Sequence, residues 1–308
     1  NLPWREVFTD SQLQTLIEQG LANNTDLQTA ILKVKEAQAA LMTSRLAYAP
    51  MLALSPQGTI SSFDKSAATK TYSLPVTASW ELDLFGNLLN AKRGSQVALL
   101  QTKAYRQAVQ TQIISGIANT YYTLLMLDKQ LEISEQTADV MKRNVETMRA
   151  MKDAGMTNAA AVAQSEAAYA QVIASLPAIR QSIREAENAL CMLLRQAPQA
   201  IKRSTLEEQQ LPTQFSVGVP LQLLSNRPDV KAAEMNLAST YYNTNAARAA
   251  FYPQITISGS AGWTNSAGSV IVNPGKLLAS VVGSLTQPLF YRGSNIARLK
   301  IAKAQQEE

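Results

Sequence analysis

The chain has 308 residues, of which 46% are hydrophobic and 17% charged, and its net charge is +5. This length fits two ordinary domains or one elongated domain, and the interleaving of basic with acidic residues argues against a nucleic-acid-binding face. The chain has no histidine and a single cysteine, which excludes Ser-His-Asp and Cys-His catalysis, most zinc sites and an internal disulfide.

The N-terminal part, residues 9–48, predicts two helices. An apolar stripe at helical spacing indicates the first helix, and Asp10 or Ser11 precedes it as the cap. The second helix continues until Pro50, because a proline cannot continue the helical hydrogen-bond ladder.

Residues 51–63 and 71–84 predict two β-strands that are joined by a polar loop. Apolar and polar residues alternate along both, so each strand has one apolar and one polar face. In the second strand the apolar face is assigned to Tyr72, Leu74, Val76, Trp80 and Leu82, and the polar face to Thr77, Ser79 and Glu81.

Residues 87–153 contain no proline and predict one helix about 100 Å long. A mostly apolar seam from Ile113 to Met148, with Thr120 and Ser134 as its polar members, alternates by four and three, and a second such seam begins at Val162. The two seams favour an antiparallel coiled-coil hairpin over residues 87–196, with its tip at Gly155.

A proline-rich segment, residues 196–220, is interpreted as a linker between two similar halves. Residues 25–55 and 228–258 are similar without gaps, which predicts an internal duplication. The identical positions are Asp26/Asp229, Ala30/Ala233, Arg45/Arg248, Ala47/Ala250, Pro50/Pro253 and Ser55/Ser258.

The duplication gives the predicted domain organisation. Repeat 1 covers residues 9–200, and repeat 2, which is incomplete, covers 221–308. The elements expected in repeat 2 are a helix at 228–250, strands at 254–264 and 277–290, and the start of a long helix at 293–308. In its first strand Ile255, Ile257 and Trp263 are assigned to the apolar face, and Thr256 and Ser258 to the polar face.

Long two-faced strands are typical of a transmembrane β-barrel, with lipid outside and water inside. A soluble antiparallel sheet with one face on a core has the same alternation, so the pattern alone leaves both open. Four strands cannot close a barrel, and an open sheet edge is not viable in lipid. If the strands span a membrane, several copies of the chain therefore share one barrel, and Trp80 and Trp263 are candidate anchors at its interfaces.

Three segments resemble the outer-membrane factor family, the TolC/OprM/CusC-like exit ducts of tripartite efflux pumps. They are "WELDLFGN" (80–87), "NRPDVKAAEMNLASTYYNTNAARAAFYPQITISGSAGW" (226–263) and "QPLFYRGSN" (287–295). The start of the chain, "LPWREVFTDSQLQTLIEQGLANNTDL", is similar to the lipoprotein-type subunits of this family that work with RND transporters.

The resemblance implies a mainly α-helical fold with β-strands, in which long coiled-coil helices form a helical barrel in the periplasm. Four strands per protomer contribute to a twelve-stranded barrel in the outer membrane of a Gram-negative bacterium. The implied partners are two further copies of the chain, a periplasmic adaptor protein, an inner-membrane RND transporter and outer-membrane lipid. The linker would lie in an equatorial belt, and loops 64–70 and 265–275 would face the cell exterior.

The resemblance also implies roles for the hairpin tip. The tip would contact the adaptor and form part of the closed aperture, through Met151, Asp153, Gly155, Met156 and Thr157. Related proteins commonly carry Leu-Asp shortly after the tip glycine, whereas this chain has alanines there, so Asp153 is the remaining candidate for an acidic gating residue.

Two departures from the family pattern produce further expectations. The family has a second long helical hairpin after the second strand pair. We therefore expect this chain to be a fragment, or a part of a longer protein whose remainder is not included. No acylated cysteine precedes Asn1, so a native lipid anchor would have been removed together with the signal sequence.

Two functions from different classes follow from these patterns. The first is a passive exit duct for drugs, other small molecules or ions. The second is a soluble coiled-coil scaffold or adaptor with a small β-sheet domain, which explains the heptads but not the duplicated helix–strand–strand–helix order. The sequence has no Walker A run, dinucleotide loop or metal-ligand cluster, so we expect neither an enzyme nor a cofactor.

Overall fold

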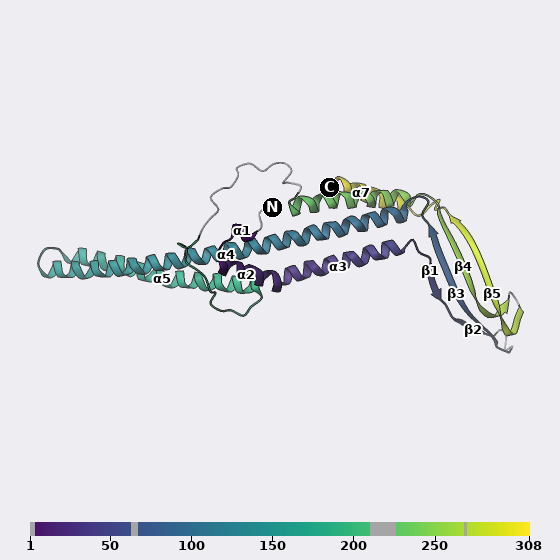
Figure 1. The fold of residues 1–308 in the computed structure, drawn as a ribbon, viewed down its shortest axis with the longest axis horizontal. Coiled ribbons are helices and arrows are strands. Elements are labelled where there is room, and N and C mark those ends of the chain that lie inside the picture. Colours follow the sequence, from purple (N-terminus) through teal and green to yellow (C-terminus); the bar gives the residue numbers. More distant parts are fainter. Residues whose placement is uncertain (1–3, 63–66, 210–225, 268–269) are drawn as a thin grey trace. The chain divides into compact units, whose positions relative to one another are not determined.

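A computed structural model describes residues 4–62, 67–209, 226–267 and 270–308 of the chain (Figure 1). The fold is mainly helical, with one antiparallel sheet. Contacts between residues divide the chain into two units, one of residues 1–31 and 106–224 and the other of residues 32–105 and 225–308.

The first unit is helical. It contains α1 (Trp4–Val7), α2 (Ser11–Asn23), the start of α3 (Thr25–Leu46), α4 (Asn87–Asp153) from residue 106 onwards and all of α5 (Ala159–Leu194). The short α1 was not predicted. The carboxylate of Asp10 accepts hydrogen bonds from the backbone N–H groups of Gln12 and Leu13, so of the two predicted caps Asp10 is the one that begins α2.

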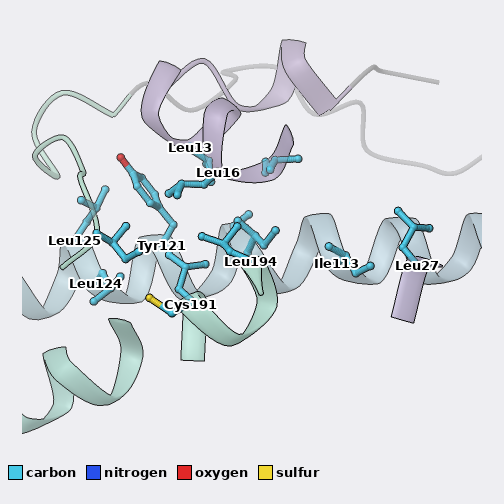
Figure 2. Packing of buried hydrophobic residues seen from close by; sticks show 14 of the residues in the cluster. Leu13, Leu16, Leu27, Ile113, Tyr121, Leu124, Leu125, Cys191 and Leu194 are labelled. Atoms are coloured by element: carbon cyan, nitrogen blue, oxygen red, sulfur yellow. The ribbon is translucent and has the colours of Figure 1, made fainter. Parts of the chain in front are cut away.

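The second half of α4 and α5 form the predicted antiparallel hairpin, in which they run side by side (Figure 1). Residues of both heptad seams are buried or half-buried, and the seam ends in a compact apolar core against α2 (Figure 2). Tyr121 and Leu124 from α4 and Leu190, Cys191 and Leu194 from α5 are at most 1% exposed in this core. Cys191 is therefore a free cysteine that packs as a small buried hydrophobe.

Ion pairs along the hairpin show that the register is fixed from the tip to the core. Arg149 binds Glu166 at 2.7 Å near the tip, and Arg180 binds Glu135 at 2.8 Å further along. The members of each pair lie at similar sequence distances from the loop around Gly155, as an antiparallel hairpin requires. These exposed pairs contribute about 0–1 kcal/mol each, so apolar burial in the seam dominates the stability of the hairpin.

The second unit contains a helical layer and a sheet. Its helices are the rest of α3, α4 up to residue 105, α7 (Pro228–Ala249) and α8 (Ser294–Glu307). Side-chain contacts give their order, in which Gln101 of α4 donates to Asn236 of α7 at 3.4 Å. Ser44 of α3 and Ser95 of α4 share a hydrogen bond of 2.7 Å, and the buried Thr244 of α7 donates to the Ala302 carbonyl of α8 at 3.1 Å.

The sheet is antiparallel in the order β1–β3–β4–β5, and β2 also pairs with β3. The strands are β1 (Met51–Leu54), β2 (Gln57–Ser61), β3 (Thr69–Leu82), β4 (Gln254–Ala267) and β5 (Val270–Thr286).

The predicted strand boundaries need correction in each strand pair. The single strand expected at 51–63 is broken into β1 and β2 at Ser55 and Pro56, and residues 63–66 lie outside the described residues. The strand expected at 71–84 runs two residues earlier, as β3. The loop expected at 265–275 is mostly strand, because β4 continues to Ala267 and β5 begins at Val270, while residues 287–290 lie outside β5.

Each strand pair is flanked by the helices that precede and follow it in the chain. α3 leads into β1, β3 leads into α4, α7 leads into β4, and β5 leads into α8. The strands and the helices of this unit therefore follow one another in the same lateral order, and the sheet passes directly into the helices that continue its strands (Figure 1).

Candidate membrane-spanning sheet and helical tip

The ladder between β3 and β4 brings the predicted apolar residues of both repeats onto one face of the sheet. Directly opposite pairs share a face of an antiparallel sheet. The pairs on this face are Leu74↔Trp263, Val76↔Ala261, Trp80↔Ile257 and Leu82↔Ile255, and Tyr72 continues the same face opposite Gly58 of β2.

This apolar face has no cover in the described part of the chain. Leu74, Val76 and Trp263 are 46%, 48% and 58% exposed, and Val281 of the outer strand is 80% exposed. A soluble antiparallel sheet buries one face against a core. Among the strand residues outside 267 and 270–274, Asn265 is the only buried one. Neither face of the sheet therefore rests on a core formed by the described residues.

In β3 and β4 the opposite face of the sheet is polar and mostly uncharged. The ladder places Thr77 opposite Ser260, Ser79 opposite Ser258, and Glu81 opposite Thr256. These residues include all five that the sequence assigned to the polar face. Hydroxyl groups can exchange hydrogen bonds with water, so this face suits an aqueous surface.

The close contact of β3 with β4 depends on a glycine. A Cβ atom on Gly262 would lie 2.2 Å from the carbonyl oxygen of Leu74 and 2.5 Å from Cα of Pro75. Pro75 lies opposite Gly262 in the ladder. The absence of a side chain is what permits the two backbones to approach at this point.

The junction of β3 with α4 is built from polar bonds around an aromatic strand end. The Trp80 indole N–H donates to the Tyr48 carbonyl at 2.9 Å, so the strand end is tied to the turn before β1. The Asp83 carboxylate accepts from the backbone N–H groups of Leu88 and Leu89 at 3.1 and 2.7 Å. Asp83 thus satisfies free N–H groups in the first turn of α4.

The hairpin tip has the local geometry that its sequence predicts. Gly155 has a positive φ of 74°, and the Asn158 side chain accepts from the Ala161 N–H as the cap of α5. The side chains of the other tip residues are half-buried or exposed, and Met156 is 72% exposed. The predicted tip residues Met151, Asp153, Gly155, Met156 and Thr157 all lie in this turn or at its edges.

Sequence reasoning missed a polar cluster that ties the segment after α5 to α2 and α4. The Asp10 carboxylate accepts from the Tyr121 hydroxyl at 2.6 Å, from Gln209 at 2.9 Å and from the Ser204 hydroxyl. Burial alone would raise the pKa of Asp10, but these hydrogen bonds and one from the Gln12 N–H outweigh burial and lower it to about 2. Burial and the bond to Asp10 raise the pKa of Tyr121 to about 12.

A second missed cluster is ionic. The Arg203 guanidinium binds Glu187 at 2.7 Å and also binds both oxygens of Asp128, while Glu187 is only 4% exposed. The hydrogen bonds to Asp128, followed by those to Glu187, raise the pKa of Arg203. The segment predicted as a linker is thus fixed as far as residue 209, and residues 210–220 lie outside the described residues.

The described residues contain no group of three or more His, Cys, Asp or Glu side chains that could hold a metal ion. None of the helices in the described ranges is both long and apolar enough to cross a membrane.

Comparison with known proteins gives matches along most of the chain. The family model for outer membrane efflux proteins matches residues 16–194 and 219–308. The cation efflux system protein CusC of Escherichia coli O6:H1 is 31% identical over 315 residues, which cover all of this chain and 68% of that protein. The toluene efflux pump outer membrane protein TtgC of Pseudomonas putida is 28% identical over 320 residues, covering 99% of this chain and 65% of TtgC.

Solved structures give the same result for the fold. A crystal structure of CusC is 29% identical and matches with a TM-score of 0.91, covering all of this chain and 72% of that one. The open state of the Neisseria gonorrhoeae channel MtrE is 28% identical and matches with a TM-score of 0.87, covering 99% of this chain and 70% of that one.

Proposed function

We propose a working arrangement from the premise that this chain belongs to the outer membrane efflux protein family. The protein is an outer-membrane channel of a tripartite efflux pump and reaches into the periplasm. In our proposal its sheet is one third of a twelve-stranded barrel shared by three copies, and its helices form the wall of a periplasmic tunnel.

The uncovered apolar face of the sheet carries this proposal. A row of side chains that includes Leu74, Val76 and Val281 is about half exposed or more. Full burial of one such side chain contributes about 1.5–3 kcal/mol of stability. A protomer in water would lose this contribution at every position of the row. In a transmembrane β-barrel, lipid contacts the apolar outer face while the polar face lines a water-filled lumen.

The edges of the sheet support a barrel made of several copies. In the described part of the chain β5 pairs only with β4, and β1 and β2 pair only with β3, so each edge strand has one free side. Unpaired backbone groups in hydrocarbon cost several kcal/mol each. A symmetric ring of copies removes both free edges, and a trimer gives the twelve strands of our proposal.

The proposed tip role rests on the exposed turn between α4 and α5. Met151, Asp153, Gly155, Met156 and Thr157 would contact the periplasmic adaptor and close the aperture around the pore axis, with an inner-membrane RND transporter as the third component. Asp153 is the acidic side chain of this turn and is exposed, so three copies would gather three negative charges there.

The cargo proposed for this channel is broad. The similar proteins are named for cation efflux (CusC) and for toluene efflux (TtgC). Between residues 73 and 82 and between 254 and 264, most side chains on the polar face of β3 and β4 carry hydroxyl groups, and Glu81 is the one charged side chain there. Such a mostly uncharged surface suits both ions and polar organic molecules, so we assign selectivity to the partner transporter. A lipid anchor before Asn1 stays a prediction.

The soluble scaffold is the competing function. It accounts for the hairpin, whose register is held by seams and ion pairs. It leaves the exposed Leu74, Val76 and Trp263 in water without a partner, which is costly over such a continuous patch.

Detergent dependence separates these two functions. We expect the protein to fractionate with the outer membrane, to require detergent for extraction, and to have the mass of three copies in light scattering after correction for the detergent. A protein that stays monodisperse and monomeric in buffer without detergent would rule out the barrel and favour the scaffold.

A further inference from the structure

We propose that the free edge of β5 pairs with the free edge of β1 and β2 of a second copy in one defined register, with Ser284 directly opposite Gln57. The inference rests on the proposed trimeric channel and identifies which residues meet at each of its seams. It uses the duplication of the chain as a template, because the seam between the two repeats is visible within the protomer.

The two strand pairs are built alike. In the first pair Leu52 of β1 lies opposite Ala78 of β3, and in the second pair Ile255 of β4 lies opposite Leu285 of β5. The spacing from Leu52 to Ile255 is the one that aligns the identical residues of the two repeats. Because Leu52 corresponds to Ile255, their ladder partners Ala78 and Leu285 also correspond to each other. This pair defines the spacing between equivalent residues of β3 and β5.

Two further features of the strand ends obey these spacings. Trp80 donates to the Tyr48 carbonyl, and Gln287 donates to the Phe251 carbonyl, both at 2.9 Å. Trp80 and Gln287 are related by the β3-to-β5 spacing, and Tyr48 and Phe251 by the β1-to-β4 spacing. The same β3-to-β5 spacing relates the positive-φ glycines that precede α4 and α8, which are Gly86 (φ 77°) and Gly293 (φ 76°).

The seam within the protomer is the β3–β4 ladder, in which Thr77 lies opposite Ser260. By the β3-to-β5 spacing, Thr77 corresponds to Ser284 of β5. By the β1-to-β4 spacing, Ser260 corresponds to Gln57 of β2. Applied to the rest of the ladder, the relation gives the other pairs between copies: Ser280 with Ser61, Val281 with Ile60, Val282 with Thr59, Gly283 with Gly58, Leu285 with Pro56 and Thr286 with Ser55.

The side chains agree with this register, although they were not used to derive it. Val281 and Ile60 meet on the apolar face and are 80% and 73% exposed in the protomer. Ser280 and Ser61 meet on the polar face. A slip by one residue would bring apolar side chains of one strand to the polar face of the other, so it is excluded by burial.

The backbone directions agree as well. The Ser55 N–H donates to the Pro75 carbonyl at 3.1 Å, so the backbone groups of Ser55 point towards β3. Because these groups alternate in direction along an antiparallel strand, those of Gly58 point towards the free edge. Following the alternation through β3, β4 and β5 leaves Gly283 pointing outwards, and the register places it opposite Gly58.

Disulfide cross-linking tests the register directly. Ser284 and Gln57 would form a non-hydrogen-bonded pair, with Cα atoms about 4.5 Å apart, which suits a disulfide. The experiment combines Ser284→Cys with Gln57→Cys in a Cys191→Ser background and follows covalent trimers on non-reducing gels of the protein in detergent. The matched control is Thr77→Cys with Ser260→Cys, the equivalent pair within one chain, which shows that such a pair oxidises without joining copies.

Two comparison pairs test the register, because in each the second cysteine lies two residues from position 57 on the same face of the sheet. We expect covalent trimers from Ser284→Cys with Gln57→Cys, and far less product when Ser55→Cys or Thr59→Cys replaces the second substitution. More product from either comparison pair would overturn the register and leave the channel intact. No product from any pair in a protein with trimeric mass would overturn the edge pairing, while a monomeric mass would remove the proposed channel itself.

Discussion

Trp80 of β3 lies directly opposite Ile257 of β4, and both side chains lie on the apolar face, 41% and 36% exposed. The two residues come from different repeats, so the face is continuous across the internal seam. In a protomer surrounded by water this face would be a large apolar patch, and in the proposed barrel it is the surface that lipid covers.

An arginine on the apolar face should therefore be far more damaging than one on the polar face. We expect Val76→Arg to cost about 2–4 kcal/mol, since Val76 lies midway along β3, and to reduce the amount of heat-resistant trimer on gels of outer-membrane extracts. Thr77→Arg is the matched control at the same height and should cost under about 1 kcal/mol. Equal losses from the two variants would contradict the assignment of the faces.

The contact between Gly262 and Leu74 predicts a second difference between matched variants. A Cβ atom at position 262 meets backbone at 2.2 Å, whereas at Gly259 the nearest atom is at 3.5 Å. We expect Gly262→Ala to destabilise the sheet by about 1–3 kcal/mol, because neither backbone can move without loss of the ladder. Gly259→Ala should be near neutral, and thermal unfolding in detergent compares them. A neutral Gly262→Ala would mean that β3 and β4 are further apart than described.

The ionic cluster around Arg203 should be a major contribution to the stability of the helical unit. Arg203→Ala leaves Glu187 buried at 4% exposure without its main partner, and such a loss costs about 3–5 kcal/mol. Arg180→Ala removes an exposed pair with Glu135 and should cost under about 1 kcal/mol. Urea unfolding followed by circular dichroism measures both, and similar midpoints for the two variants would refute the role of Arg203.

The carboxylate of Asp10 predicts an acid-dependent loss of stability. Its pKa is about 2 in the folded protein and 3.8 in a free side chain, so the stabilisation is complete above about pH 5 and is lost as the pH falls through 3.8 towards 2. Because the side chain is partly exposed, screening reduces the contribution to about 1–2 kcal/mol.

The corresponding test compares Asp10→Asn with the wild type across pH. We expect the variant to be less stable by that amount at pH 7, with the difference shrinking as the pH falls from 5 to 2. A difference that stays constant over this range would show that the charge of Asp10 is not what stabilises the cluster.

Much of the architecture could be predicted from local patterns. The heptad seams predict which residues of α4 and α5 are buried, and Gly155 with Asn158 predicts where the hairpin turns, because each signal lies within a few residues of the chain. The alternation in β3 and β4 likewise predicts the two faces of the sheet, and the ladder then pairs them as the faces require.

The polar clusters could not be predicted, because their members are far apart in the sequence. Asp10, Tyr121 and Ser204 meet only when α2, α4 and the segment after α5 pack together. The break at Ser55 and Pro56 was also missed, although the proline is a local signal that β-edge strands often carry. The extension of β5 back to Val270 runs through Pro274 and Gly275, which a pattern-based prediction assigns to a loop.

The central claim is that this protein is a gated duct, and planar-bilayer conductance of the full-length protein tests it most directly. The comparison sets the wild type beside Asp153→Ala with Gly155→Ala, which removes the tip charge and strains the left-handed turn (φ 74°), and beside Asp139→Ala, an exposed residue of α4 away from the tip. The account predicts small conductance for the wild type and the Asp139 variant and a large one for the tip variant. No conductance from any of the three, in a protein that stays soluble and monomeric without detergent, would contradict it.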